Sequence, residues 1–188
     1  MIRLLMICIT LSAITFCSFG QQMEIPVSQQ IPLLVKVLSF NKSFQQDKKD
    51  IVVGVIYRES QPSTNSIKDT VLQFNDSTLL ILANGNAVRF VPINLDRKGE
   101  LEAVFAKKLF SAVYVTPVEL SCIPIISNFC REHRILSMTG VAQYVEEGIS
   151  VGIGMRNQKP EILINLPVSK GEGANFSSRV LQIAKIYR

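Results

Sequence analysis

The segment IVVGVIY, residues 51–57, is an unbroken apolar run with polar sequence on both sides. A strand that is covered on both faces has apolar side chains at every position, whereas a half-exposed strand alternates. The run therefore predicts a central strand of a parallel sheet with helices on both faces. A second short run, AVYV at residues 112–115, has the same character and stops at Thr116 and Pro117.

Helical periodicity surrounds these two strands. Before residue 51, apolar side chains recur at the spacing of one helical face, namely Ile31, Leu34, Val35 and Leu38. Ser28 is expected to cap this helix. The same reasoning places further elements along the chain: helices after residue 65 and at 100–110, 123–131 and 141–147, strands at 87–93 and 135–138, and a last helix from Ser177 that carries Val180, Leu181, Ala184 and Tyr187.

The last third of the chain changes pattern. Residues 149–156 alternate between apolar and small or polar side chains, residues 157–160 have turn chemistry, and Ile162 and Ile164 alternate again. Two such strands joined by a short turn form an antiparallel hairpin. The sequence therefore predicts a single α/β domain, with a mostly parallel sheet flanked by helices, a C-terminal antiparallel hairpin and a terminal helix.

Residues 1–20 have the pattern of a cleavable signal peptide. Arg3 supplies a positive charge, the next 13 residues carry none, and small residues at 18 and 20 precede the expected cleavage site. A 13-residue helix rises only about 20 Å, short of the ~30 Å hydrocarbon core. Phe16 stands where a lipoprotein signal needs a small residue before Cys17, which argues against a lipid anchor. The sequence therefore predicts an exported domain, residues 21–188, in the periplasm.

Composition narrows the classes of function. Without residues 1–20 the chain has 19 Lys and Arg against 15 Asp and Glu, and a hydrophobic content of 47% for the whole chain excludes intrinsic disorder. The positive charge is not clustered, so no nucleic-acid partner is expected. His133 is the only histidine, which excludes a multi-histidine zinc centre and ranks a hydrolase with His133 as base last. We expect a protein that is not an enzyme and has no metal, cofactor or catalytic residue.

Ligands of parallel α/β sheets bind beyond the carboxyl ends of the strands. In this sequence, the residues at or just after those ends are the candidate ligand- or partner-binding residues: Tyr57, Arg58, Thr116, Glu119, Thr139 and Gly140. The alternative explanation for these positions is ordinary loop and capping chemistry. Thr116 precedes a proline that stops a strand, and Thr139 suits the cap of the next helix.

Cys122 and Cys130 are the two cysteines outside residues 1–20. On one continuous helix their Cα atoms would lie about 12 Å apart, beyond the ~7 Å that a disulfide spans. Pro124 leaves another arrangement open, because a helix that begins there frees Cys122 to fold back. Free thiols and a disulfide both remain open from the sequence.

After the hairpin, residues 165–181 include several side chains for which the sequence predicts structural roles. Asn165 comes where a strand ends, so its side chain is expected to replace lost backbone partners. Phe176 and Leu181 are expected to be buried, with Asn175 or Ser177 accepting the first free amides of the last helix. In the alternative, residues 175–177 form an exposed edge that docks a partner.

Several segments together resemble the YfiR-like family of bacterial periplasmic proteins. They are VSQQIPLLVKVLSF (27–40), IVVGVIY (51–57), VYVTP (113–117), ILSMTGVAQYVEEG (135–148) and EILINLPVSKGEGANFSSRVLQIA (161–184), and the end of the last one, with Asn165, Pro167, Gly173, Phe176 and Ser177, is the most specific. The resemblance implies a regulatory protein that binds the periplasmic part of an inner-membrane sensor such as a diguanylate cyclase and lowers cyclic di-GMP signalling. The family's namesake has two pairs of cysteines, so redox control is not carried over. The alternative function is a periplasmic small-molecule binder of the solute type.

Overall fold

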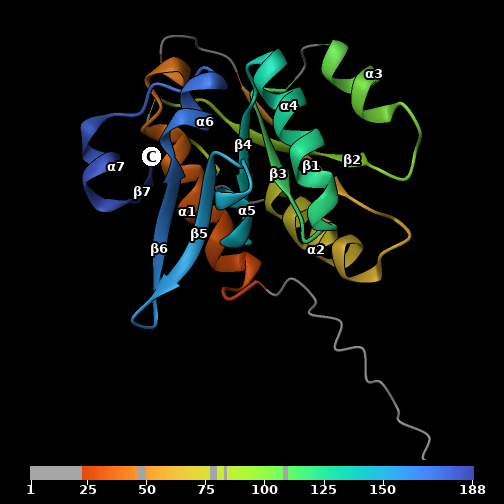
Figure 1. Ribbon diagram of the computed structural model, residues 1–188, viewed down its shortest axis with the longest axis horizontal. Coiled ribbons are helices and arrows are strands. Elements are labelled where there is room, and N and C mark those ends of the chain that lie inside the picture. The colour runs from red at the N-terminus through yellow and green to blue at the C-terminus, as the bar shows by residue number, and fades with distance from the viewer. Residues whose placement is uncertain (1–22, 46–49, 77–79, 83, 108–109) are drawn as a thin grey trace, which may run out of the picture.

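One sheet organises the part of the chain that the computed structural model describes, residues 23–45, 50–76, 80–82, 84–107 and 110–188. The expected signal peptide and Cys17 lie outside these residues. Within them, seven strands have the order β2-β1-β3-β4-β5-β6-β7 (Figure 1). Their bounds are Ile51–Tyr57 (β1), Val88–Asn94 (β2), Ala112–Val115 (β3), Leu136–Thr139 (β4), Val151–Arg156 (β5), Lys159–Asn165 (β6) and Lys185–Tyr187 (β7).

The strand pairings confirm the predicted fold class. β1 pairs in parallel with β2 and β3, and β4 pairs in parallel with β3 and β5. The β5–β6 hairpin is antiparallel, and β7 returns parallel to β6. The run at 51–57 is therefore an interior strand with all but one side chain buried, as its unbroken apolar pattern predicts.

Helices cover both faces of the sheet. The described α-helices are α1 (Val27–Ser39), α2 (Pro62–Leu72), α3 (Glu100–Ala106), α4 (Ile123–His133), α5 (Gln143–Glu146), α6 (Leu166–Gly171) and α7 (Ser178–Ile183), and the described 3-10 helices are η1 (Lys42–Phe44), η2 (Gln73–Asp76) and η3 (Leu120–Cys122). α1, α2 and α7 contribute to one apolar cluster, and α3, α4 and α5 contribute to the other. The sheet lies between the two clusters, so the domain has three layers (Figure 1).

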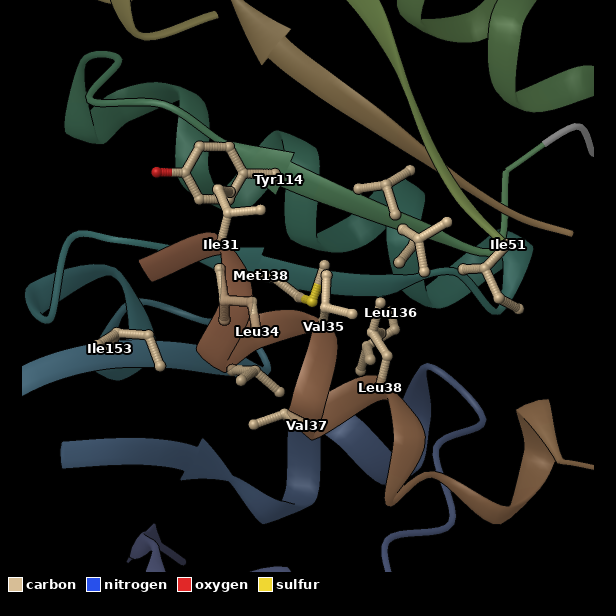
Figure 2. Packing of buried hydrophobic residues seen from close by; sticks show 14 of the residues in the cluster. Ile31, Leu34, Val35, Val37, Leu38, Ile51, Tyr114, Leu136, Met138 and Ile153 are labelled. Atoms are coloured by element: carbon tan, nitrogen blue, oxygen red, sulfur yellow. The ribbon is translucent and has the colours of Figure 1, made fainter. Parts of the chain in front are cut away.

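Alternate side chains of the central strands belong to the two clusters on opposite faces of the sheet. In β3, Tyr114 belongs to the cluster under α1, whereas Val113 and Val115 belong to the cluster under α4. Figure 2 shows the α1 side chains Ile31 and Leu34 packed over the strands that carry Tyr114 and Met138. The four α1 residues that the 3.6-residue period selects are all buried. Burial of one such side chain stabilises the fold by about 1.5–3 kcal/mol.

Helix and turn boundaries differ from the sequence predictions at several places. α1 begins at Val27 and no side chain caps it, so the expectation for Ser28 was wrong. α3 ends at Ala106, four residues before the predicted end. In the β5–β6 turn, Asn157 and Gln158 alone connect the strands, with φ of 49° and 60°. This is the two-residue turn in which both central residues have positive φ.

The end of the chain differs most from the sequence predictions. A short helix, α6, begins at Leu166 with Pro167 in its first turn, where the sequence analysis expected only the end of a strand. α7 ends at Ile183, and the last helix does not continue to Tyr187 as expected. Residues 185–187 instead form β7 and pair with the last three residues of β6. The backbone of β6 supplies the partners for this strand, which periodicity within the segment itself does not reveal.

Candidate functional site

The sheet order places a switch point at β1. From β1 the chain crosses through α2 to β2 on one side, and then through α3 to β3 on the other side. α2, which follows β1, and α4, which follows β3, pack on opposite faces of the sheet, so the loops that leave β1 and β3 diverge. Open α/β sheets bind ligands in the crevice at this point, beyond the carboxyl ends of the strands.

Arg58, the first residue after β1, is the centre of the polar contacts at this crevice. Its Nη1 lies 3.2 Å from Asp96 Oδ1, and its Nε lies 2.9 Å from Glu119 Oε2. Its Nη2 donates to Cys122 Sγ at 3.3 Å. The Cys122 sulfur and the two carboxylates raise the pKa of Arg58 against the opposing effect of burial, with the Cys122 hydrogen bond as the largest cause. The guanidinium therefore stays charged and joins the ends of β1, β2 and β3.

Hydrogen bonds join the loop after β2 to the loop after β1. The Ser60 N–H donates to Asp96 Oδ2 at 2.7 Å, and the Asp96 N–H donates to Asn94 Oδ1 at 3.0 Å. The Asn94 Nδ2 in turn donates to Glu59 Oε2 at 2.9 Å. The Ser60 N–H, together with Arg58, lowers the pKa of Asp96. These bonds fix the backbone that forms one wall of the crevice.

A cavity of about 190 Å³ opens beside Arg58, between α3, the start of α4 and the loop after β2. Its lining has two kinds of side chain. Its charged side chains are Arg58, which is already paired with Asp96 and Glu119, and Arg97, Lys98 and Glu102. The Nε of Arg97 lies 3.6 Å from Glu100 Oε2. The apolar part of the lining is formed by Leu95, Leu101, Ile125 and Ile126. Ile125 is 55% exposed. This lining favours a small ligand that combines an anionic group with an apolar part.

Two of the six predicted residues meet at the crevice, and one faces elsewhere. Arg58 and Glu119 form the ion pair described above. Tyr57 is buried, and the ammonium group of Lys68 on α2 lies 4.8 Å from the centre of its ring. Tyr57 therefore packs against α2 and is absent from the lining of the cavity beside Arg58.

The other three predicted residues are buried and have internal partners. The Thr116 hydroxyl donates to the Ile56 carbonyl at 2.9 Å, and the Thr139 hydroxyl donates to the Val115 carbonyl at 3.0 Å. Gly140 has no room beside it, because a Cβ there would stand 1.7 Å from Gln30 Oε1. The side chain of Gln30 thus fills the space that a ligand of this strand end would need, and these residues have the structural roles that the sequence left as an alternative.

Both cysteines are free thiols in the structure, so the disulfide that the sequence left open is not formed. Cys122 ends η3 and faces Arg58, while Cys130 lies two turns into α4 on its buried face. Burial raises the pKa of the Cys130 thiol, with a further effect of the Glu172 charge. The short 3-10 turn does not fold Cys122 back toward Cys130.

The C-terminal residues singled out by the sequence mostly have structural contacts. Asn165 Oδ1 accepts from the Val168 N–H at 3.2 Å and caps α6, and its Nδ2 donates to a carbonyl of α5 at 2.9 Å. Gly173 has a φ of 83°, in the left-handed region. Phe176 is 8% exposed, and its backbone forms an isolated antiparallel β-bridge with Asn41.

The expectation for Ser177 was wrong. Ser177 precedes α7, but its side chain makes no cap bond, and its buried hydroxyl has no hydrogen-bond partner. Asn175 contacts the segment after α1 through its backbone: its N–H donates to Asn41 Oδ1 at 2.9 Å. Leu181 is half-buried rather than buried.

Sequence reasoning missed three contributors to polar clusters. Asp96 and Cys122 join Arg58 only because separate loops converge, and the sequence carries no signal that pairs them. Glu172 is 2% exposed although it lies between two glycines in a polar stretch. The described residues contain no group of three or more His, Cys, Asp or Glu side chains placed to hold a metal ion. Among the helices of the described residues, none is long and apolar enough to cross a membrane.

The chain is similar in structure to known proteins but has no match to them by sequence. No family model and no curated protein matches the chain. Three solved structures are similar. The ABC domain from Streptococcus pneumonia in complex with L-Trp has a TM-score of 0.58 at 14% identity, over 86% of this chain and 62% of its own.

The other two are a substrate binding protein with adhesive properties from Clostridium difficile and a conserved domain protein from Vibrio cholerae. The first, in a ligand-free open structure, has a TM-score of 0.58 at 16% identity, over 87% of this chain and 60% of its own. The second has a TM-score of 0.56 at 13% identity, over 87% and 60%. The chain thus spans about three fifths of the length of these solved chains. At such identities the likeness shows the fold, a single α/β domain with a mostly parallel sheet.

Proposed function

We propose that the chain is an exported binding protein, not an enzyme, that takes a small anionic ligand with an apolar part in the cavity beside Arg58. The observation that carries the proposal is the position of this cavity at the switch point of the sheet, with the exposed cations Arg97 and Lys98 beside an apolar lining. An anion would bind Arg97 and Lys98, because Arg58 already pairs with Asp96 and Glu119. Its apolar part would contact Ile125, which is exposed in the lining.

The solved structures support a small organic ligand. One of them was solved with L-Trp, a molecule that combines a carboxylate with a large apolar group, and another is described as a substrate binding protein. The signal-peptide pattern of residues 1–20 supports export to the periplasm, where such a protein meets its ligand. N-terminal sequencing of the protein recovered from the periplasm tests the export step, and a mature chain that still begins at Met1 would contradict it.

A thermal-shift screen tests the ligand. The set contains amino acids, short aliphatic acids and aromatic carboxylates, each beside an uncharged analogue of the same shape. A ligand at a hundred times its dissociation constant should add about 2.7 kcal/mol to the free energy of unfolding. Only the anionic member of a pair should stabilise the protein.

A charge-neutralising variant locates the site. Arg97 and Lys98 are exposed side chains of the cavity lining, so their joint replacement by serine should weaken the binding of any hit without unfolding the domain. The matched control replaces Lys36 and Lys42, two exposed lysines outside the lining, by serine. No hit in the whole set, or equal weakening in the two double variants, would contradict the proposal.

A second candidate function is contact with a membrane protein. A second hollow of about 360 Å³ lies between α1, α7 and β6, where Ile183 is 62% exposed beside Leu33 and Ile162. Arg156 and Lys159 border it. This apolar surface favours a protein partner, and the resemblance to the YfiR-like family suggests the periplasmic part of an inner-membrane diguanylate cyclase.

A pull-down from the membrane fraction of the same organism tests the second candidate. The wild type should recover one membrane sensor repeatedly, and Ile183→Ser should lose it. Ile81→Ser is the matched control, because Ile81 is 58% exposed and does not line this hollow. Recovery of the sensor by Ile183→Ser would show that the contact lies elsewhere on the protein. An unchanged cyclic di-GMP level after deletion of the gene would argue against the role in signalling.

A further inference from the structure

Glu172 is a buried carboxylate at the amino ends of the interior strands β4 and β5, whereas the cavity beside Arg58 lies at the carboxyl ends of the strands. It is 2% exposed and lies just after α6. The Ser137 N–H donates to its Oε2 at 2.8 Å, and the Ser137 hydroxyl donates to its Oε1 at 2.7 Å. The Ser150 hydroxyl also donates to Oε2. Ser137 lies on β4 and Ser150 directly before β5, so one carboxyl group joins residues 172–177 to the amino ends of two parallel strands.

The charged groups around Glu172 do not neutralise it. Arg131 on α4 attracts the carboxylate, but its Nη2 donates to Ser127 at 3.4 Å, and no ion pair joins it to Glu172 among the described contacts. The Cys130 thiol of α4 is also close, and Arg134 packs beside Gly173. Burial raises the pKa of Glu172 from 4.5 to about 7, against the hydrogen bonds from the two serines and the charge of Arg131.

The loop that follows Glu172 also ties together distant parts of the chain. The Lys42 N–H donates to the Asn175 carbonyl at 2.9 Å, and the Ser177 N–H donates to the Phe40 carbonyl at 3.0 Å. The Ser43 hydroxyl donates to the Gly173 carbonyl at 3.1 Å. Residues 172–177 therefore connect the end of α1 with the amino ends of β4 and β5.

We propose that the 172–177 loop is a pH-dependent attachment, whose local opening becomes more frequent when the Glu172 carboxyl group ionises in its buried site. Because the closed loop raises the pKa of Glu172, it binds the proton more tightly than the open loop does. The closed form is therefore most stable below pH 4.5, and its stability falls as the pH rises from there through about 7. With these two pKa values, the opening constant rises about tenfold between pH 6 and pH 8.

Hydrogen exchange of the whole protein, followed by mass spectrometry of its peptides, measures this opening. After correction for the intrinsic exchange rate, amides of residues 172–177 should lose protection about tenfold between pH 6 and pH 8, whereas amides of β1 should not. Glu172→Gln keeps the shape of the side chain without a titratable proton, so its protection should not depend on pH. Glu147→Gln is the matched control, because Glu147 is exposed, and it should keep the wild-type pH dependence.

Two results would overturn the proposal: a pH-independent loop in the wild type, or a Glu172→Gln variant with the wild-type pH dependence. If Glu172→Gln does not fold, Ser150→Ala supplies the same test. Loss of the hydroxyl donor raises the pKa of Glu172 further, so the pH at which protection is lost should move upward. An unchanged midpoint in Ser150→Ala would then count against Glu172 as the titrating group.

Discussion

Replacing Gly140 with alanine should destabilise the fold strongly, because this position has no room for a methyl group. A Cβ there would stand 1.7 Å from Gln30 Oε1 and 2.5 Å from Gln30 Nε2. Gln30 is fully buried, and its side chain has no space into which it can turn without breaking its own contacts. The added methyl group must therefore displace the amide of Gln30.

The cost follows from the hydrogen bonds that this amide makes to oxygen atoms. Gln30 Oε1 accepts from the Tyr114 hydroxyl at 2.9 Å, and Gln30 Nε2 donates to the Ile25 carbonyl at 2.5 Å. Each buried polar group that loses its partner costs about 1–3 kcal/mol. The expected loss is therefore about 2–6 kcal/mol, out of the 5–15 kcal/mol that stabilises a typical domain.

Urea unfolding followed by circular dichroism measures this loss as a shift of the midpoint. The control is Gly171→Ala, whose Cβ would meet the flexible side chain of Arg131 at 3.3 Å, and which should stay within about 1 kcal/mol of the wild type. In a Gln30→Ala background, Gly140→Ala should cost less than about 1 kcal/mol. A small effect of Gly140→Ala alone, or an equal effect in both backgrounds, would refute the reasoning.

Three further outcomes are expected. Phe176→Ala should lower the free energy of unfolding by about 3 kcal/mol in urea, because the ring is 8% exposed; an unchanged midpoint together with lost partner binding would mean that the ring docks a partner. Asn165→Ala should cost about 1–2 kcal/mol in the same assay, because α6 loses its cap and α5 loses a bond to the amide; full stability would contradict the capping role. A thiol reagent under native conditions should modify Cys122 faster than the buried Cys130, whose raised pKa also lowers its thiolate fraction. Cys122→Ser should abolish the fast phase, and a fast phase that survives would place the reactive thiol elsewhere.

Local patterns were sufficient for the fold class and much of the core. The run at 51–57 indicates a strand covered on both faces because burial on two sides requires an apolar residue at every position. The period of 3.6 selects the buried face of α1 because that face must meet the sheet. Asn165 at a strand end indicates a backbone partner because the ladder stops there. Each of these inferences depends only on residues within one element or its immediate flank.

The candidate site could be predicted only in part. Carboxyl strand ends are recognisable from the sequence, and they include Arg58 and Glu119. Which ends form a cavity depends on the strand order, and the order places β1 between β2 and β3. The same criterion also selected Thr139 and Gly140, whose strand end is filled by Gln30 from the first helix.

The sequence by itself therefore determined the elements that a single period or a single apolar run specifies, and with them the α/β class. Tertiary structure alone decided the contacts between segments far apart in the chain: the pairing of β7 with β6, the convergence of Arg58 and Cys122, and the burial of Glu172 between Ser137 and Ser150. The physical reason is that hydrophobic periodicity records which face of an element is buried, but not which neighbour covers it. A polar residue such as Glu172 becomes buried only when partners from other strands replace its water.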